Sequence, residues 1–352
     1  MKVTHQTPAF VLTIFGLCLG IGWEASGQTA DSLSRTHVLN EEKADDPILL
    51  GNKLRQSSKS AFSDFILSDP EIYRIGDEWN KKEISKIDQI PSQLQPAALA
   101  SAKVGGATGF YIGNHGGKHI MMTNFHVCDG RLSCSPGAYI HFPLLKIYAR
   151  VGSFLGKWPD IDTALFSINI NEGDEDKLAD NYLQVRFDHA YEPFDRLASF
   201  GFGGAANKAR NLTGIWDEDC VVASRELRMI ADPDSKNPFP YRVWSFSSGC
   251  DVSHGDSGSA FIDFDSGEVV GILWTGTVPK KEEAQNSQKL EQAILNQNSR
   301  YIWDNLTYTV PASKIGKKFA LIRSQPDTDL SLKRIVNSLL TSSGYSNVFP
   351  SP

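Results

Sequence analysis

Three residue types that together can cleave an amide bond occur in separate segments of the 352-residue chain. His126 ends an apolar run, Asp162 begins another run 36 residues later, and Ser257 follows after a further 95 residues in a glycine-rich turn. A serine hydroxyl needs an imidazole to accept its proton, and the imidazole needs a carboxylate to orient it. This order predicts a catalytic triad in which His126 is the general base, Asp162 orients it and Ser257 is the nucleophile.

The turn 255–259, Gly-Asp-Ser-Gly-Ser, also offers hydrogen-bond donors for the charge that acyl transfer places on oxygen. Gly255 lets the backbone bend so that its N–H and that of Ser257 converge on one point, which predicts an oxyanion hole made by these two amides. The turn nearly matches the nucleophile elbow of α/β-hydrolases. That fold is set aside because the histidine precedes the serine and alternating strand–helix units are missing.

Taken singly, each segment also has an ordinary structural explanation. The histidine could be a buried structural residue, the aspartate the first residue of a strand, and the Gly-Asp-Ser-Gly sequence a plain turn. Their ordered occurrence in one chain favours the chemical interpretation. A catalytically silent binding protein on the same fold is the alternative, and the presence of all three side chains speaks against it.

The elements around these residues are predicted to be strands. From about residue 99 the chain has short apolar or alternating runs separated by Gly, Pro, Asn and Asp, which is typical of all-β barrels and sandwiches. The glycines of 201–204 suit a sharply bent barrel strand. Residues 280–297 are predicted to form a charged surface helix. A C-terminal helix on the second barrel is predicted from apolar residues at helical spacing: Leu332, Ile335, Val336, Leu339 and Leu340.

The N-terminus predicts export. Lys2 precedes an apolar run, 9–23, and small residues follow it up to Gly27, as in a secretory signal peptide. The run is shorter than the roughly 20 apolar residues of a membrane span, so no membrane anchor is predicted. Residues 28–74 are polar and are interpreted as a propeptide, with a mature N-terminal extension as the alternative. The expected destination is extracellular or periplasmic.

Cysteine use is consistent with export. Cys18 lies in the signal peptide, and the remaining four cysteines are an even number, as expected for two disulfides in an exported chain. Of the three possible pairings we favour Cys128–Cys134 with Cys220–Cys250. Four free thiols or a metal site are the alternatives, but the spacings lack the CxxC pattern typical of zinc sites.

Composition narrows the classes of partner. The chain is 41% hydrophobic and 22% charged, as expected for a globular protein, and its net charge of −6 gives no basic footprint for nucleic acid. The acidic stretch 172–176 could hold calcium, but it is interpreted as a solvated loop. No metal and no cofactor are predicted, because a serine mechanism is complete within the protein. We expect a monomer acting on protein or peptide substrates.

In the order His, Asp, Ser, the segments Thr-Asn-Phe-His-Val, Asp-Thr-Ala-Leu-Phe and Gly-Asp-Ser-Gly-Ser resemble those of the chymotrypsin-like serine peptidases. The resemblance covers roughly residues 75–325 and is closest to the bacterial secreted branch that includes the glutamyl endopeptidases. It implies a secreted serine endopeptidase with two six-stranded antiparallel β-barrels and a C-terminal α-helix. The expected divisions are a signal peptide 1–27, a propeptide or extension 28–74, a first barrel 75–190, a second barrel 191–325, and a C-terminal helix and tail 326–352.

The resemblance also implies a specificity pocket at Asp251, Trp274 and Gly276. A carboxylate at the base of the pocket would select lysine or arginine by a charge-assisted pair. Asp251 could instead stabilise its own turn. A preference for glutamate is not expected, because Leu273 and Val252 stand where glutamyl endopeptidases have a histidine and a small hydroxyl residue.

Asp256 corresponds to an aspartate that takes part in zymogen activation in this family. In those proteins a freed N-terminal amine pairs with this carboxylate and orders the oxyanion hole. By this resemblance we expect a zymogen cleaved after Arg74, which lies 52 residues before His126.

Overall fold

The computed structural model describes residues 81–130, 132–203, 211–218, 220–223, 225–231, 242–276 and 306–345. The predicted signal peptide, the propeptide and the cleavage after Arg74 lie outside the described residues. The predicted helix over 280–297 also lies outside them. Within the described residues no helix combines the length and apolarity needed to cross a bilayer.

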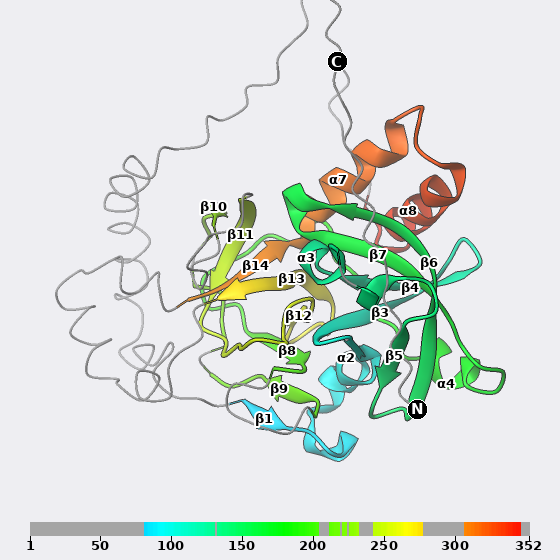
Figure 1. Ribbon diagram of the computed structural model, residues 1–352. Coiled ribbons are helices and arrows are strands. Elements are labelled where there is room, and N and C mark those ends of the chain that lie inside the picture. The colour runs from blue at the N-terminus through cyan, green and yellow to red at the C-terminus, as the bar shows by residue number, and fades with distance from the viewer. Residues whose placement is uncertain are drawn as a thin grey trace, which may run out of the picture. The chain divides into compact units, whose positions relative to one another are not determined.

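Six antiparallel strands close into a barrel that carries the predicted histidine and aspartate (Figure 1). Its order is β2-β3-β4-β7-β6-β5, and tight hairpins containing left-handed glycines join β2 to β3 and β3 to β4. Almost every side chain of β3 is buried. The strands are β2 (Ser101–Val104), β3 (Ala107–His115), β4 (Lys118–Thr123), β5 (Tyr139–Phe142), β6 (Ile147–Trp158) and β7 (Thr163–Asn169).

The second half of the chain forms an antiparallel sheet in the order β1-β9-β8-β12-β13-β14-β11-β10. The predicted all-β class is therefore confirmed, but the described part of the second unit is an eight-stranded sheet instead of a closed six-stranded barrel. Its strands are β1 (Lys82–Glu83), β8 (Leu197–Gly201), β9 (Thr213–Ile215), β10 (Arg228–Ile230), β11 (Val243–Ser248), β12 (Ala260–Asp263), β13 (Val269–Gly276) and β14 (Thr307–Pro311).

Strand β1 comes from the segment that was assigned to the first barrel, yet it pairs with β9 of the second sheet (Figure 1). The residue directly after β1, Ile84, explains this pairing. The Ile84 N–H donates to the Leu212 carbonyl at 2.9 Å, and the buried Ile84 side chain occupies the space that a Cβ at Gly214 would need. The start of the described chain is thereby fixed to the second sheet.

The predicted C-terminal helix is present as α8 (Leu330–Ser342). Asp329 caps it by accepting the N–H groups of Ser331 and Leu332 at 2.8 and 3.0 Å. Its buried face consists of the predicted residues Ile335, Val336, Leu339 and Leu340, with Leu332 partly buried. The predicted position on the second barrel is wrong, because α8 packs on α7 (Ala312–Ser324) and on β3 of the first barrel.

Helix α7 was not predicted, although Ile315, Phe319 and Ile322 have the spacing of one helical face and are all buried. The Phe319 ring packs edge-on against Trp158 and Phe187, with centroids 5.4 and 5.8 Å apart. The other helical segments are short: η2 (Ile87–Gln89), η3 (Ser92–Leu94), α2 (Gln95–Ala100), α3 (Phe125–Cys128), η4 (Leu132–Cys134), η5 (Pro159–Ile161) and α4 (Glu175–Ala179).

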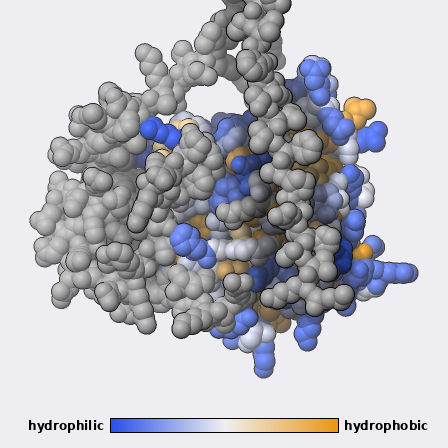
Figure 2. All heavy atoms as spheres, viewed as in Figure 1, coloured by the Kyte–Doolittle hydropathy of each residue, from blue (hydrophilic) through white to orange (hydrophobic). Residues whose placement is uncertain are grey.

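Apolar side chains form two buried clusters. The larger one runs through the barrel and under α7 and α8, and the smaller one lies within the eight-stranded sheet around Phe246 and Phe261. The outer edge of the coloured part in Figure 2 is mainly hydrophilic. This core holds the ends of the strands, where the predicted triad residues lie, in fixed positions.

Candidate active site

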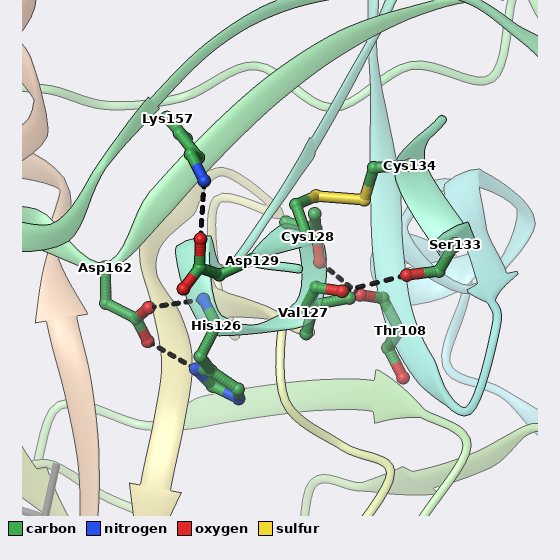
Figure 3. Close-up of a disulfide and its surroundings, with 10 residues drawn as sticks. Thr108, His126, Val127, Cys128, Asp129, Ser133, Cys134, Lys157 and Asp162 are labelled. Carbon is green, nitrogen blue, oxygen red and sulfur yellow. Dashed lines mark hydrogen bonds and ion pairs between the residues drawn. A yellow bond between two sulfur atoms is a disulfide. The ribbon is translucent and has the colours of Figure 1, made fainter. Parts of the chain in front are cut away.

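His126 lies in the single helical turn α3, directly after β4 ends. Its side chain is 14% exposed and its ring nitrogen Nδ1 lies 2.8 Å from Asp162 Oδ2 (Figure 3). The His126 backbone N–H donates to Asp162 Oδ1 at 3.0 Å. An ionised carboxylate can only accept, so Nδ1 carries the proton and the other ring nitrogen of a neutral imidazole is left as a base.

Asp162 is completely buried, between the end of η5 and the start of β7. Its φ of 35° lies in the left-handed region, which few non-glycine residues adopt. The Asn124 side chain donates to the Asp162 carbonyl at 2.9 Å and so fixes this backbone. Both ends of the carboxylate and the main chain behind it are therefore held by the segment 124–126.

Ser257 lies in a tight loop between β11 and β12 and is half-buried. Its carbonyl accepts the Thr108 N–H at 3.0 Å, and the next residue, Gly258, donates to the Leu273 carbonyl at 2.9 Å. Gly258 has φ +85°, and a Cβ there would lie 2.2 Å from both the Thr108 carbonyl oxygen and Thr123 Oγ1. Only glycine allows this loop to approach the barrel so closely.

Thr108 on β3 joins the serine loop to the barrel. Its hydroxyl donates to the Gly255 carbonyl at 2.8 Å and accepts the Phe202 N–H at 3.0 Å. Its carbonyl accepts the Thr123 hydroxyl at 2.6 Å, three residues before His126. Thr108 was not among the predicted site residues, since nothing in the sequence distinguishes it from the other threonines in strands.

The peptide groups around Ser257 have defined directions. The Asp256 carbonyl accepts the Ser259 N–H at 2.9 Å. No described peptide bond is cis, so the Ser257 N–H points opposite to that carbonyl and away from the turn. Gly255 has φ +106°, and a Cβ there would lie 2.5 Å from the Phe202 carbonyl oxygen. Glycine is therefore required at 255, as the sequence predicted from chain flexibility alone.

The Asp256 side chain is buried, and both of its carboxylate oxygens contact polar groups. Its Oδ1 accepts the Gly203 N–H at 2.9 Å and its Oδ2 accepts the Ser253 N–H at 2.8 Å. Lys81 Nζ forms an ion pair with Oδ2. A Cβ at Gly203 would lie 2.1 Å from Oδ2 and one at Gly201 would lie 2.5 Å from Oδ1, so these two glycines of the predicted strand bend also make room for this carboxylate.

Residues 107–272 match the family described as the trypsin-like peptidase domain. The matched span begins with β3 and ends within β13, so it contains the His126, Asp162 and Ser257 segments. The chain carries a trypsin-like peptidase domain. The predicted enzyme class, a serine peptidase and hence a hydrolase, is thus confirmed, whereas membership of the glutamyl endopeptidase branch is not.

Among solved structures, the peptidase is similar to the inactive form of the Rv3671c protease, with 17% identity, a TM-score of 0.42 and coverage of 65% of this chain and 92% of that one. The active form from M. tuberculosis gives 16% identity, a TM-score of 0.40 and coverage of 65% and 83%. No curated protein matches the chain by sequence.

Both predicted disulfides of the peptidase are present, and each lies beside the site. Cys128–Cys134 closes a loop directly after His126 (Figure 3), where the Ser133 hydroxyl also donates to the Val127 carbonyl at 2.8 Å. Cys220–Cys250 joins the segment before β10 to the start of the serine loop. The disulfides therefore hold two of the segments that carry triad residues.

The three residues predicted for the specificity pocket have different surroundings. The Trp274 ring is 2% exposed, and its Nε1–H donates to the Ser245 hydroxyl at 2.8 Å, so the side chain belongs to the core. A Cβ at Gly276 would lie 2.9 Å from Val252 Cγ2. Asp251 is half-buried just before Val252. Asp251 and Gly276 thus border the same residue, and the Trp274 side chain does not join them.

Proposed function

We propose that this peptidase cleaves protein and peptide substrates through an acyl-enzyme on Ser257, with His126 as general base and acid and Asp162 as its orienting carboxylate. The observation that carries the proposal is the double contact from Asp162 to the ring and the backbone of His126. This contact fixes both the tautomer and the direction of the imidazole, which is what a triad requires.

The reaction follows from the properties of these groups. The Nε2 atom of His126 takes the Ser257 proton as the hydroxyl oxygen attacks the carbonyl carbon of the scissile bond. The imidazolium then formed is stabilised by the Asp162 carboxylate. It returns the proton to the departing amine, which leaves an ester on Ser257. Water, deprotonated by the same imidazole, hydrolyses this ester and restores the serine.

The amides of Gly255 and Ser257 are proposed as the oxyanion hole. Support comes from the direction of the Ser257 N–H, opposite to the engaged Asp256 carbonyl, and from the positive φ of Gly255. Preorganised backbone donors need no reorganisation when the negative charge develops, and one such donor is worth about 10²- to 10³-fold in rate.

We further propose that the protein is exported as a single-chain monomer without a membrane anchor, with residues 1–27 as the signal peptide and 28–74 as a propeptide or extension. The two disulfides support an oxidising destination. The catalytic part then consists of 75–190 and 191–325, and 326–352 forms the C-terminal helix and tail. N-terminal sequencing of protein secreted by the native host tests the first boundary.

A preference for lysine or arginine before the scissile bond is proposed from Asp251. Support comes from its position six residues before Ser257 and directly before Val252, whose side chain faces Gly276 at the end of β13. Asp251→Ala is expected to reduce cleavage after basic residues selectively. Equal loss of cleavage after all residues would show that Asp251 supports its own turn instead.

Digestion of casein, with the products mapped by mass spectrometry, tests the proposed activity. The wild-type protein is expected to release peptides, and Ser257→Ala or His126→Ala to lower the rate by about 10⁴-fold or more. A catalytically silent binding protein would give no products, and its peptide binding would be unaffected by Ser257→Ala.

A further inference from the structure

The ion pair between Lys81 and Asp256 is buried beneath the serine loop. The two side chains are only 3% and 2% exposed, and Lys81 Nζ lies against Asp256 Oδ2. Lysine is almost never buried unless it is paired, because an ammonium group loses strong hydration. A buried lysine next to the residue that precedes the nucleophile therefore calls for a functional explanation.

Strand β1 delivers this lysine to its position. Lys82 and Glu83 pair with Gly214 and Thr213 of β9, and the Thr213 hydroxyl donates to the Gly201 carbonyl at 3.1 Å. Lys82, the neighbour of Lys81, is exposed, with Nζ 5.1 Å from the centre of the Trp216 ring. Lys81 directly precedes β1, so the pairing of β1 with β9 fixes the backbone from which the Lys81 side chain reaches Asp256.

We propose that Lys81 is a positioning residue that supplies an internal cation to Asp256 and so orders the oxyanion hole in the intact chain. This inference rests on the proposed function of Ser257. It means that the chain needs no freed N-terminal amine to become competent, in contrast to the zymogen cleavage after Arg74 that the family resemblance implies.

The geometry explains how the pair would act on the site. Asp256 lies between Gly255 and Ser257, so the direction of its side chain is linked to the two peptide groups that flank it. Its carboxylate accepts the N–H groups of Gly203 and Ser253 as well as the ammonium of Lys81. Without the cation, a buried negative charge would remain, and the carboxylate would be driven toward water. That rotation would turn the Ser257 N–H away from the developing oxyanion.

The same contacts leave little room for a second cation. Asp256 Oδ1 accepts the Gly203 N–H, and Oδ2 accepts the Ser253 N–H and pairs with the Lys81 ammonium. The backbone at Gly201 and Gly203 also lies close to the carboxylate, since a Cβ at either position would lie 2.5 or 2.1 Å from one of its oxygens. A freed N-terminal amine would have to displace Lys81 from a buried position before it could pair with Asp256.

The first test uses the wild-type chain from residue 28 onward, with an affinity tag fused in front of residue 28. A fluorophosphonate probe is added, and intact mass spectrometry reads which form of the chain is labelled. We expect the uncleaved chain to be labelled as fast as any processed form, within about twofold. Labelling that is restricted to processed chains would overturn the inference while leaving the proposed function in place.

The second test compares labelling rates of variants. Lys81→Met is expected to react about 10²- to 10³-fold more slowly, the effect of losing one oxyanion donor. Lys82→Met, a change of the same kind at the exposed neighbouring position, is expected to react at the wild-type rate. Lys81→Arg keeps a cation and is expected to react faster than Lys81→Met, which separates a need for charge from a need for bulk.

A double variant keeps the test valid if Lys81→Met alone does not fold. Lys81→Met/Asp256→Asn removes both charges together, so no lone charge is buried, and it is expected to fold and to react as slowly as Lys81→Met. A folded Lys81→Met or double variant that reacts at the wild-type rate would contradict the inference alone. Absence of labelling in every wild-type form would instead contradict the proposed function of Ser257.

Discussion

Asp162 combines three features that a structural aspartate rarely has together. It is fully buried, it accepts two N–H groups from one histidine, and its backbone has a positive φ. Two of these features carry a cost, because burial removes water from a charge and the positive φ strains the backbone. Such costs are commonly found at functional sites, and here they place a carboxylate behind His126.

Replacing Asp162 by asparagine tests this role directly. The amide keeps the size of the side chain but presents an N–H group, so the imidazole must adopt the other tautomer. We expect hydrolysis to fall about 10⁴-fold with little change in melting temperature. The control is Asp160→Asn, since this nearby carboxylate is 55% exposed and forms a surface pair with Lys318. A loss of less than about tenfold in Asp162→Asn would contradict the assignment.

The predictability of the site differs from residue to residue. The triad segments could be recognised because each combines a reactive side chain with strand or turn residues in a fixed order. Lys81 could not, because its partner is distant in the chain and the pairing depends on β1 joining the second sheet. Gly203 gave a signal, but a glycine run indicates only a special backbone and not the carboxylate that approaches it.

Strand β3 is the element that links the two halves of the site. Through Thr108 it contacts the loop of Ser257, the Phe202 segment and the strand that leads to His126. The register of β3 with β4, with Phe110 opposite Met122, places Thr108 close to Thr123. The distance between nucleophile and base thus depends on one strand of the barrel.

Thr108→Val should weaken this link. The isosteric change leaves the Gly255 carbonyl and the Phe202 N–H without their partner, at a cost of about 1–3 kcal/mol for each buried group. We expect a lower free energy of unfolding and slower casein hydrolysis. The control is Thr309→Val, because the buried Thr309 hydroxyl has no partner among the described residues and its loss should be nearly neutral. Equal effects of both changes would refute the role of Thr108.

At the level of elements, the sequence predicted correctly those features that depend on neighbouring residues alone. The apolar residues of α8 recur at helical spacing in the sequence, and the structure confirms that they form its buried face. The predicted packing partner of α8 was wrong, because an apolar helical face does not indicate which surface it will contact. Strand β1 has only two residues, too few for a periodic signal, and its place follows from tertiary contacts of Ile84.

For the molecule as a whole, α7 connects the end of the second sheet to the barrel. It follows β14 directly, and its Phe319 packs on Trp158, the last residue of β6 before the turn that presents Asp162. The C-terminal part of the chain therefore supports the position of a residue in the first half.

Phe319→Ala measures this support. Removal of a fully buried ring should lower the free energy of unfolding by about 3–5 kcal/mol. Leu321→Ala on the same helix is the control, since its side chain is 49% exposed and its loss should change stability by about 0.5 kcal/mol or less. Urea unfolding of the two variants gives the comparison. Similar values for both would show that α7 does not pack as described.

The acid stability of the molecule should depend on His115, which joins β3 to α8. Its ring lies 2.9 Å from the Ser338 hydroxyl and 2.8 Å from the Ile112 carbonyl oxygen. Burial lowers the pKa of His115, and the carbonyl offsets this only in part. Between about pH 6.5 and the lowered pKa of the folded chain, the unfolded chain therefore binds more protons at His115 than the folded chain does, so the free energy of unfolding decreases as the pH falls.

Urea unfolding at pH 7.5 and 5.5 tests this dependence in the wild type and in His115→Gln. The variant is expected to lose less stability on acidification, because it lacks one of the groups that protonate on unfolding. Some dependence should remain, since burial also lowers the pKa of His141 and His189. An identical loss in both proteins would show that His115 does not contribute.

Site mapping of a fluorophosphonate probe by peptide mass spectrometry tests most directly whether His126 and Asp162 activate Ser257. We expect a single adduct on the peptide that contains Ser257, none in Ser257→Ala and strongly slowed formation in Asp162→Asn. No adduct in the wild type, or an adduct that persists in Ser257→Ala, would contradict this activation.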